Sequence, residues 1–356
     1  MKKIILTGGG SAGHVTPNLA LIPELKRRGF DITYICSKDG MEREILEKEG
    51  VPYHAVTADK LRRYASLKTL TAPVRIQHGY HEAIRLLRKL KPDVIFAKGG
   101  YVSVPVVKAA KRLKIPVLLH ESDLTPGLAN RLCFKDVTFA LCNFPETLEY
   151  LPAGKSFVSG CPIRESLKDG SREAGLAFTG LPGEKPVLMI IGGSLGSVYL
   201  NTKVRDNLDA LLERFEIVHL CGKGHLDETL TGRPGYVQYE YISAEMKDLF
   251  AMADLVLSRS GANAICELLY LQKPMLLVPL SKAASRGDQI LNARSFEKQG
   301  FAMVLEEEEI TDEKLLAAIG ELYEKRDELR AKMAESLQSD AVSFVCNKIE
   351  EAMKHE

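Results

Sequence analysis

Short apolar runs alternate with longer amphipathic stretches along the chain, and most of these runs are bounded by Gly, Asp or Pro. This alternation is typical of the strands and crossover helices of a parallel sheet. The apolar runs predict strands at Ile4–Thr7, Ile32–Cys36, Val94–Ala97 and Val117–His120, and again at Val187–Ile191, Ile217–Leu220, Leu255–Ser258 and Met275–Val278. Helical periodicity occurs at Leu19–Arg28, Met41–Glu49, Val104–Leu113, Ala244–Met252, Ala262–Leu271, Asp288–Gln299 and Glu313–Lys354. We therefore predict an α/β fold with two sheets.

The pattern restarts in the second half of the chain. The first strand ends in a glycine loop, Gly8–His14, and the strand Val187–Ile191 ends in a second one, Gly192–Ser197. The two copies lie too far apart for the ~20–50-residue period of a solenoid, and they indicate two nucleotide-binding halves. Polar, breaker-rich sequence at 163–184 marks the boundary. We predict an N-terminal domain (1–163), a C-terminal domain (164–340) and a terminal helix (341–356) that packs back on the N-terminal domain.

The composition excludes several classes of protein. With 356 residues, 45% of them hydrophobic, the chain is neither disordered nor fibrous. Lys+Arg (48) balance Asp+Glu (47), so nucleic acid is not an expected partner. The seven cysteines form no C-x-x-C pair and no Asp-x-Asp triplet occurs, so we expect no metal site. Without a membrane-spanning run or a signal peptide, the protein should be cytosolic, and contact with a membrane surface stays open. The acidic run Glu306–Glu309 is interpreted as a solvated turn without a function.

The first glycine loop, Gly8-x-Gly10-x-x-Gly13, formally matches the dinucleotide-binding fingerprint, in which glycines let the backbone approach phosphates. A nicotinamide enzyme would usually place an acidic residue at the end of the second strand, where only Asp39 is a possible substitute. The second glycine loop argues further against a dehydrogenase. A tight turn without a ligand is the alternative.

Three segments that follow strand ends of the first domain should share one crevice, because ligands bind outside the carboxyl ends of parallel strands. One holds His14, which can act as a base or a neutral hydrogen-bond partner at pH 7, or can merely pack the loop. The others are Lys98–Ser103 and His120–Gly127. In the last we favour a functional role for Asp123. Glu121 and the histidine before it are as well explained by hydrogen bonds that fix the loop.

In the second domain, Ser258–Glu267 follows a strand and opens a helix. Small residues there permit close approach of a diphosphate, the helix N-terminus offers donors, and Glu267 can clasp a ribose diol. Asp288 and Gln289 begin another helix and can hold sugar hydroxyls, although Asp288 is as well explained by N-capping. A diphosphate leaving group would be stabilised by helix dipoles and an arginine, for which Arg164 is well placed.

The segment Lys60–Lys91 contains nine Lys or Arg residues against one acid, Glu82, interleaved with apolar residues. A basic amphipathic surface of this kind suits an anionic membrane. Nucleic acid and a solvated helix face are the competing interpretations.

As an ordered set, five motifs resemble the peptidoglycan N-acetylglucosaminyltransferases of glycosyltransferase family 28: Gly9–His14, Gly99–Ser103, His120–Glu121 with Pro126–Arg131, Gly192–Gly196 and Ser258–Glu267. The resemblance spans residues 4 to about 304. It implies a GT-B fold, with two Rossmann-like domains whose parallel sheets face across a cleft. It further implies an inverting hexosyltransferase, without a cofactor or metal, that moves N-acetylglucosamine from UDP-N-acetylglucosamine to the 4-hydroxyl of undecaprenyl-diphospho-N-acetylmuramoyl-pentapeptide (lipid I to lipid II).

The resemblance also implies roles for single residues. Donor contacts carry over to Ser11, Ala12, Gly13, Arg164, Ser194, Ile242, Ala262, Asn263, Ala264, Ile265, Cys266, Glu267 and Gln289. The acceptor side carries over to Gly99, Gly100, Tyr101, Glu121, Asp123 and Asn130. His14 is the first choice as the catalytic base and Asp123 the second. Three features depart from the family pattern: Ser11-Ala12-Gly13 replaces Thr-Gly-Gly, Asp123 stands where Asn is usual, and Asp288-Gln289 stands where Gln-Gln or His-Gln is usual.

The resemblance places the protein peripherally on the cytoplasmic face of the cell membrane, in peptidoglycan synthesis, where cell-wall synthesis proteins are possible partners. The rival hypotheses are a related GT-B enzyme, such as a diacylglycerol glycosyltransferase or a UDP-N-acetylglucosamine 2-epimerase, and a non-catalytic UDP-sugar sensor.

Overall fold

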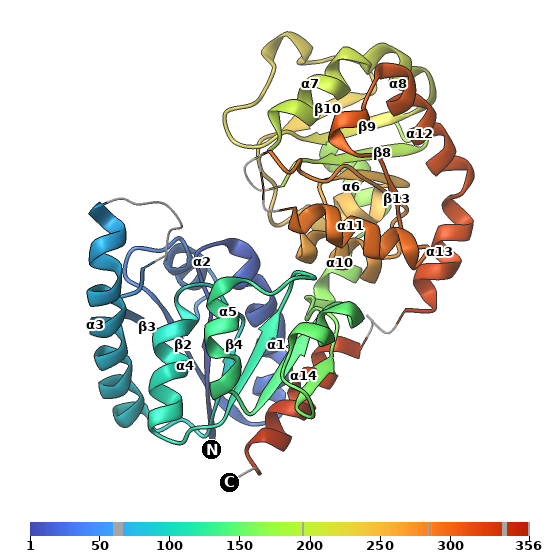
Figure 1. Cartoon of the computed structure of the whole chain (residues 1–356). Coiled ribbons are helices and arrows are strands. Elements are labelled where there is room, and N and C mark those ends of the chain that lie inside the picture. The colour runs from blue at the N-terminus through green and yellow to red at the C-terminus, as the bar shows by residue number, and fades with distance from the viewer. Residues whose placement is uncertain (60–66, 194–195, 284, 286, 337–339, 355–356) are drawn as a thin grey trace. The chain divides into compact units, whose positions relative to one another are not determined.

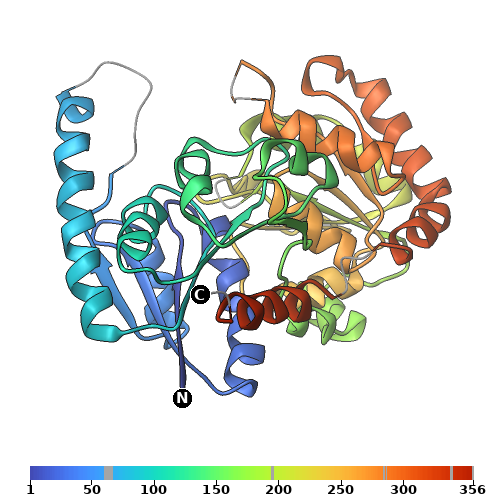
Figure 2. The ribbon, with the colours of Figure 1, turned by 60° about the horizontal axis from the view of Figure 1, so that its bottom comes forward.

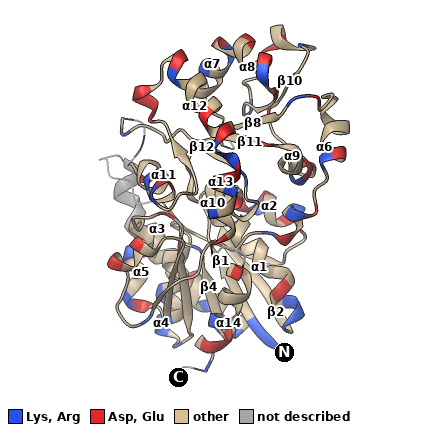
Figure 3. Ribbon diagram, turned by 90° about the vertical axis from the view of Figure 1, so that its right-hand side faces the viewer, with Lys and Arg blue, Asp and Glu red and all other residues tan. Residues whose placement is uncertain are grey.

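The computed structural model describes residues 1–59, 67–193, 196–283, 285, 287–336 and 340–354, apart from the side chains of Ala12 and residues 67–73 (Figure 1). The chain forms two compact units. The first comprises Met1–Arg164 together with Asp340–Glu356, and the second comprises Glu165–Ser339. Lys and Arg (blue) and Asp and Glu (red) both occur in each unit (Figure 3), in keeping with the net charge of +1.

The first unit contains a seven-stranded parallel sheet in the order β3-β2-β1-β4-β5-β6-β7. The strands are β1 (Lys2–Thr7), β2 (Phe30–Ser37), β3 (Tyr53–Val56), β4 (Val94–Ala97), β5 (Val117–Glu121), β6 (Phe139–Cys142) and β7 (Ser156–Val158). The central strand β1 pairs with both β2 and β4, with Ile4 opposite Ile32 and Val94. The strands β3, β6 and β7 are not among the predicted strands.

Helices cover both faces of this sheet. They are α1 (Thr16–Arg27), α2 (Glu42–Lys48), α3 (Leu67–Leu90), α4 (Ser103–Arg112), α5 (Leu128–Cys133) and α14 (Ala341–Ala352). Alternate residues of β1 enter different cores: Ile4 packs with α1 and α14, whereas Ile5 packs with α3 and α4. Because both faces are covered, the strands read as continuous apolar runs. The terminal helix α14 lies beside α1 and belongs to the first unit (Figure 2).

The second unit contains a six-stranded parallel sheet in the order β10-β9-β8-β11-β12-β13. The strands are β8 (Val187–Ile191), β9 (Glu216–Leu220), β10 (Tyr236–Tyr239), β11 (Leu255–Ser258), β12 (Met275–Leu277) and β13 (Met303–Val304). The helices are α6 (Arg172–Thr179), α7 (Val198–Asp206), α8 (Leu208–Arg214), α9 (Met246–Met252), α10 (Ala262–Tyr270), α11 (Asp288–Lys298), α12 (Asp312–Glu324) and α13 (Arg326–Ala334). The helical stretch predicted at Glu313–Lys354 is therefore interrupted, and its last part, α14, joins the other unit.

Both sheets have the strand order of the dinucleotide-binding fold, in which the order reverses next to the first strand. The reversal lies between β1 and β4 in the first unit and between β8 and β11 in the second. The prediction of two Rossmann-like α/β domains is confirmed. Ligands of such sheets bind at this reversal, outside the carboxyl ends of the strands, which is where both glycine loops lie. Among the described helices, none combines the length and apolar composition that a bilayer crossing requires.

Candidate active site

The first glycine loop leaves β1 at the carboxyl edge of its sheet and is held by two buried side chains beneath it. Asn18 Nδ2 donates to the Tyr34 hydroxyl oxygen (2.9 Å), and this hydroxyl donates to the Gly8 carbonyl oxygen (2.9 Å). Gly10 has a φ of +91°, and a Cβ at this position would stand 2.6 Å from Cε1 of Tyr101. Glycine is required here by both the backbone conformation and the available space.

His14 ends the 3₁₀ turn η1 (Ala12–His14), is half-buried, and has its Nδ1 2.7 Å from the Ser11 hydroxyl oxygen. If the hydroxyl donates to Nδ1, the neutral imidazole carries its proton on Nε2. If Nδ1–H donates to the hydroxyl, Nε2 keeps its lone pair and can accept a proton, as a base must. Ser11 is therefore placed to orient His14, and Gly13 lies in the same turn.

The loop after β4 packs directly on the first glycine loop. Gly99 and Gly100 have φ values of +96° and +78°, and a Cβ at Gly100 would overlap the Gly9 carbonyl oxygen. The Tyr101 ring, in the loop after β4, lies against Gly10 of the first glycine loop. The predicted acceptor residues of this loop and the loop that carries His14 are thus brought together.

Glu121 and Asn130 organise the loop that follows β5. The Glu121 carboxylate accepts hydrogen bonds from the backbone N–H groups of Ser122 (2.8 Å), Asp123 (3.1 Å) and Gly127 (3.1 Å), and from Asn130 Nδ2 (2.8 Å). Burial, followed by the charge of Asp123, raises the pKa of Glu121. These contacts favour the loop-fixing interpretation of Glu121. A Cβ at Gly99 would stand 2.6 Å from Asn130 Oδ1, so this loop also adjoins the one after β4.

His120 belongs to a buried cluster below this loop. The Lys98 Nζ lies 2.8 Å from His120 Nδ1 and also donates to the Ser122 hydroxyl, while His120 Nε2 lies 2.9 Å from the Gly160 carbonyl oxygen. An ammonium group can only donate, so Nδ1 accepts and the Nε2–H donates. Burial, followed by the charge of Lys98, lowers the pKa of His120 well below its ordinary value. His120 is a neutral structural side chain, and Lys98 was not among the predicted site residues.

Asp123 and Arg164 are the remaining predicted residues of the first unit. Asp123 is half-buried and is tied to Glu121 through its backbone N–H. Arg164, the last residue before the second unit, is 44% exposed, and its Nη1 lies 3.5 Å from Glu49 Oε1 at the end of α2. A role for Arg164 at a diphosphate stays a prediction.

The second glycine loop leads from β8 into α7. Gly196 has a φ of +74°, and a Cβ there would overlap the Cys221 carbonyl oxygen. Ser197 caps α7, since its hydroxyl oxygen accepts from the Leu200 N–H (3.3 Å). Ser194, predicted near the diphosphate, lies outside the described residues.

Arg259, directly after β11, ties three segments of the second unit together and was not among the predicted site residues. It is 6% exposed. Its Nη2 donates to the Ser197 hydroxyl (2.6 Å), and its Nη1 donates to the Val278 carbonyl oxygen (3.1 Å) and to Glu307 Oε2 (2.6 Å). The interpretation of the acidic run as a solvated turn is therefore wrong for Glu307, whose side chain is 16% exposed and holds a buried guanidinium.

The six predicted donor contacts of α10 divide into two sets. The helix begins after Gly261, and the side chains of Ala262, Ile265 and Cys266 are buried in the unit. Those of Asn263, Ala264 and Glu267 are half-buried. Asn263 and Glu267 lie four residues apart and therefore share one helix face. Side-chain contact with a ligand is available to the second set, whereas Ala262 can offer its backbone N–H.

Gln289 lies in the first turn of α11, and a backbone group fixes its side-chain amide. The Gln289 Oε1 accepts from the Leu280 N–H (3.0 Å), so the Nε2 of the same amide points away from Leu280. The N-cap of this helix is Gly287, with a φ of +84°, so the N-cap interpretation of Asp288 is wrong. Ile242 is buried, 9% exposed, and a contact with uracil stays a prediction.

A buried histidine supports the second glycine loop from below and makes the second unit sensitive to acid. His219 Nδ1 lies 2.9 Å from the Tyr236 hydroxyl oxygen and Nε2 lies 3.0 Å from Asn201 Oδ1, while Asn201 Nδ2 donates to the Cys221 carbonyl oxygen. Burial, followed by the charge of Arg205, lowers the pKa of His219 to about 3.

The unfolded chain binds a proton at this histidine below pH ~6.5, and the folded chain does not until about pH 3. We expect the free energy of unfolding of the second unit to fall by about 1.4 kcal/mol per pH unit below 6.5. Urea unfolding at pH 7.5, 6.5 and 5.5 measures this slope, which His219→Gln should remove. An equal slope in both proteins would contradict the assignment.

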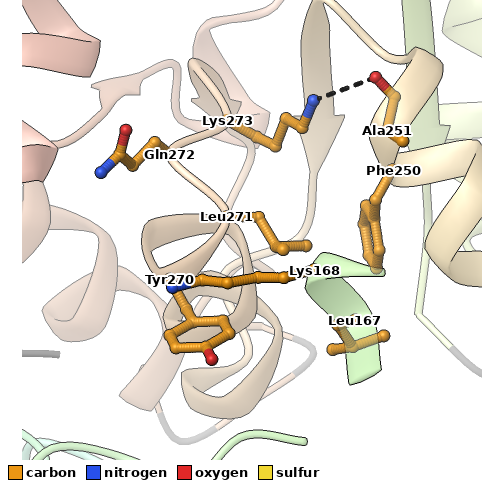
Figure 4. A pocket seen from close by; sticks show the side chains of 8 residues that line it. All are labelled: Leu167, Lys168, Phe250, Ala251, Tyr270, Leu271, Gln272 and Lys273. Atoms are coloured by element: carbon orange, nitrogen blue, oxygen red, sulfur yellow. Dashed lines mark hydrogen bonds between the residues drawn. The ribbon is translucent and has the colours of Figure 1, made fainter. Parts of the chain in front are cut away.

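A cavity of about 300 Å³ lies at the opposite edge of the second sheet, between η4 (Glu165–Lys168) and the ends of α9 and α10 (Figure 4). Lys168 Nζ lies 4.0 Å from the centre of the Tyr270 ring, and Lys273 Nζ donates to the Ala253 carbonyl oxygen (2.9 Å). Burial lowers the pKa of Lys273 to about 8. Because α9 and α10 both end at the amino edge of the sheet, this cavity is separate from the glycine loop.

Two Rossmann-like units, each with a glycine loop at the reversal of strand order, are the components of the GT-B fold. Residues 4–141 match the glycosyltransferase family 28 N-terminal domain and residues 187–347 match the glycosyltransferase family 28 C-terminal domain. The chain belongs to glycosyltransferase family 28.

The names of its relatives state a specific transferase activity. The chain is 53% identical over 354 residues to the UDP-N-acetylglucosamine--N-acetylmuramyl-(pentapeptide) pyrophosphoryl-undecaprenol N-acetylglucosamine transferase of Lachnospira eligens, covering 99% of this chain and 100% of the relative. It is 54% identical over 351 residues to the enzyme of the same name from Lachnoclostridium phytofermentans, covering 99% of both chains. Among solved structures, Acinetobacter baumannii MurG matches with a TM-score of 0.78 and 25% identity, over 99% of this chain and 100% of that one.

The fold is shared more widely. A UDP-GlcNAc 2-epimerase from Neisseria meningitidis matches with a TM-score of 0.70 at 14% identity, over 99% of this chain and 100% of that one. A likeness at this identity shows the fold alone. The family membership, and not the fold, therefore identifies the chain as a hexosyltransferase.

Proposed function

We propose that this chain transfers N-acetylglucosamine from UDP-N-acetylglucosamine to the 4-hydroxyl of the muramoyl sugar of undecaprenyl-diphospho-muramoyl-pentapeptide, with inversion at the anomeric carbon. The observation that carries the proposal is the 53% identity, over 99% of the chain, to a transferase of that name. The arrangement of loops at the carboxyl edges of both sheets supports it, because each unit offers a separate site at its own strand-order reversal.

The second unit is proposed to bind the donor. The first turn of α10 presents backbone N–H groups and a partial positive charge to the diphosphate. Glu267 is half-buried on that helix, and its two oxygens suit the ribose hydroxyls. The Gln289 amide nitrogen, opposite the oxygen that Leu280 holds, suits a hydroxyl of the sugar. The proposal includes no metal or cofactor, since the sequence has no Asp-x-Asp triplet.

The first unit is proposed to bind the acceptor and remove its proton. The 4-hydroxyl oxygen attacks the anomeric carbon, a new C–O bond forms, and the bond from that carbon to the diphosphate oxygen breaks, so that UDP leaves as an anion. The hydroxyl proton passes to Nε2 of His14 while Nδ1–H donates to Ser11. Asp123 is the second candidate for the base.

Radiolabelled transfer tests the proposal. The wild-type protein should move label from UDP-N-acetylglucosamine to a short-chain polyprenyl-diphospho-muramoyl-pentapeptide. Label in diacylglycerol instead would identify the other transferase, and epimerised free sugar would identify an epimerase. Donor binding without turnover on any acceptor would favour the hypothesis of a non-catalytic UDP-sugar sensor.

We further propose that the first unit rests on the anionic cytoplasmic face of the membrane. The contact would be made by the first half, residues 60–75, of the basic stretch Lys60–Lys91. In the second half, Tyr80, Ile84 and Leu87 pack into the core of the unit, so no apolar face remains there for lipid. Since α3 leads into β4, that half also lies toward the amino edge of the sheet, away from the candidate acceptor loops. Val74, 72% exposed, lies nearer the start of the helix.

Four of the cations in the first half, Lys60, Arg62, Arg63 and Lys68, have side chains that lie outside the described part. Replacing Arg62, Arg63 and Lys68 by Gln should weaken binding to phosphatidylglycerol vesicles by about 1 kcal/mol per charge. The matched control replaces Arg85, Arg88 and Lys89, which are exposed on the second half. Co-sedimentation measures both, and an equal loss in the control would contradict contact through the first half. Contact with other cell-wall synthesis proteins stays a prediction.

A further inference from the structure

We propose that Lys98 is a positioning residue of the acceptor site, whose buried ammonium group fixes the loop Glu121–Gly127 through its contacts with His120 and Ser122. This inference rests on the proposed function, because the loop is the one assigned to the acceptor. Lys98 follows β4 directly, ahead of Gly99 and Gly100, and it is 1% exposed.

The contacts of Lys98 place it under the middle of the loop. Its Nζ lies 2.8 Å from His120 Nδ1 and donates to the Ser122 hydroxyl. The Ser122 backbone is held as well, because its N–H donates to Glu121 Oε1 (2.8 Å) and its carbonyl oxygen accepts from Asn143 Nδ2 (2.9 Å). Lys98 thus adds a side-chain hydrogen bond at Ser122, whose backbone N–H and carbonyl oxygen are both already held.

The burial of Lys98 makes its contacts costly to lose. A buried ammonium group loses its hydration, so the hydrogen bonds that it keeps inside the protein must replace that hydration. Removing the ammonium group takes this donor away from His120 Nδ1 and from the Ser122 hydroxyl.

A kinetic split tests the positioning role. Lys98→Met keeps most of the length of the side chain and removes its charge, and Lys111→Met, at an exposed position of α4, is the matched control. We expect Lys98→Met to lower kcat/KM for the lipid acceptor by about 10- to 100-fold, while the dissociation constant for UDP-N-acetylglucosamine stays that of the wild type. Lys111→Met should leave both unchanged. An unaltered acceptor kcat/KM in Lys98→Met would overturn the proposal.

A spectroscopic measurement keeps the inference separate from the proposed function. If the wild type shows no transfer to the lipid acceptor, the proposed function fails, and the contact can still be tested by the ¹⁵N resonances of the His120 imidazole. We expect the unprotonated Nδ1 resonance to move in Lys98→Met and to stay in place in Lys111→Met. An unchanged resonance in Lys98→Met would show that the ammonium group does not hold this ring.

Discussion

Replacing His14 by alanine is expected to lower kcat by about 10²- to 10⁴-fold, the usual contribution of a general base. The imidazole is half-buried at the carboxyl edge of the first sheet, and the Ser11 hydroxyl lies 2.7 Å from its Nδ1, so Nε2 is the nitrogen that we propose takes the acceptor proton. Binding of UDP-N-acetylglucosamine should be preserved, because the predicted ribose and sugar contacts lie in the other unit. Steady-state transfer with the radiolabelled donor measures kcat, and titration calorimetry measures donor binding.

Two further variants identify the base. Ser11→Ala should lower kcat less than His14→Ala does, because it removes only the group that orients the ring. Asp123→Asn should also be the milder change if His14 is the base. A kcat that is preserved in His14→Ala and lost in Asp123→Asn would identify Asp123, and not His14, as the base.

Replacing Arg259 by methionine is expected to lower the free energy of unfolding of the second unit by about 3–5 kcal/mol, the usual cost of leaving one buried partner of an ion pair uncompensated. Glu307 would lose the guanidinium that lies 2.6 Å from its Oε2, and the Ser197 hydroxyl would lose two donors. The donor should also bind more weakly, because the turn that follows β8 and the end of β12 would no longer be joined. Urea unfolding and donor titration measure the two effects.

The double variant Arg259→Met/Glu307→Leu is the control for this loss. Removing both charges leaves no buried carboxylate without a partner, so part of the stability should return. Donor binding should remain weak, since the link to Ser197 is still missing. A single Arg259→Met variant as stable as the wild type would show that water compensates Glu307 and that the pair does not hold the segments together.

The central strands were predictable because they are buried on both faces. The strands β1, β4, β8 and β11 consist largely of consecutive apolar residues, which is the pattern of a parallel sheet covered by helices. The strands at the sheet edges were not predictable in this way. Tyr53–Val56 and Ser156–Val158 are short and partly exposed, and they become strands through pairing with a neighbour that is already in place.

The location of the candidate site followed from the same pattern. A parallel sheet brings the carboxyl ends of its strands to one edge, so polar loops after successive strands had to meet there. The structure brings His14, Tyr101 and Glu121 to that edge of the first sheet through contacts between their loops. The roles of single side chains did not follow. Glu121 was a candidate for ligand contact, and its oxygens instead meet backbone N–H groups of its own loop.

The sequence by itself determined the two Rossmann-like halves and the glycines at their turns, because periodicity and the need for a positive φ are properties of neighbouring residues. Only the tertiary structure decided that Lys98 and Arg259 are buried cations. The partners of these cations, His120 and Glu307, are 22 and 48 residues away in the chain. Such pairs form only after the strands between them have aligned, and no local pattern of the sequence records them.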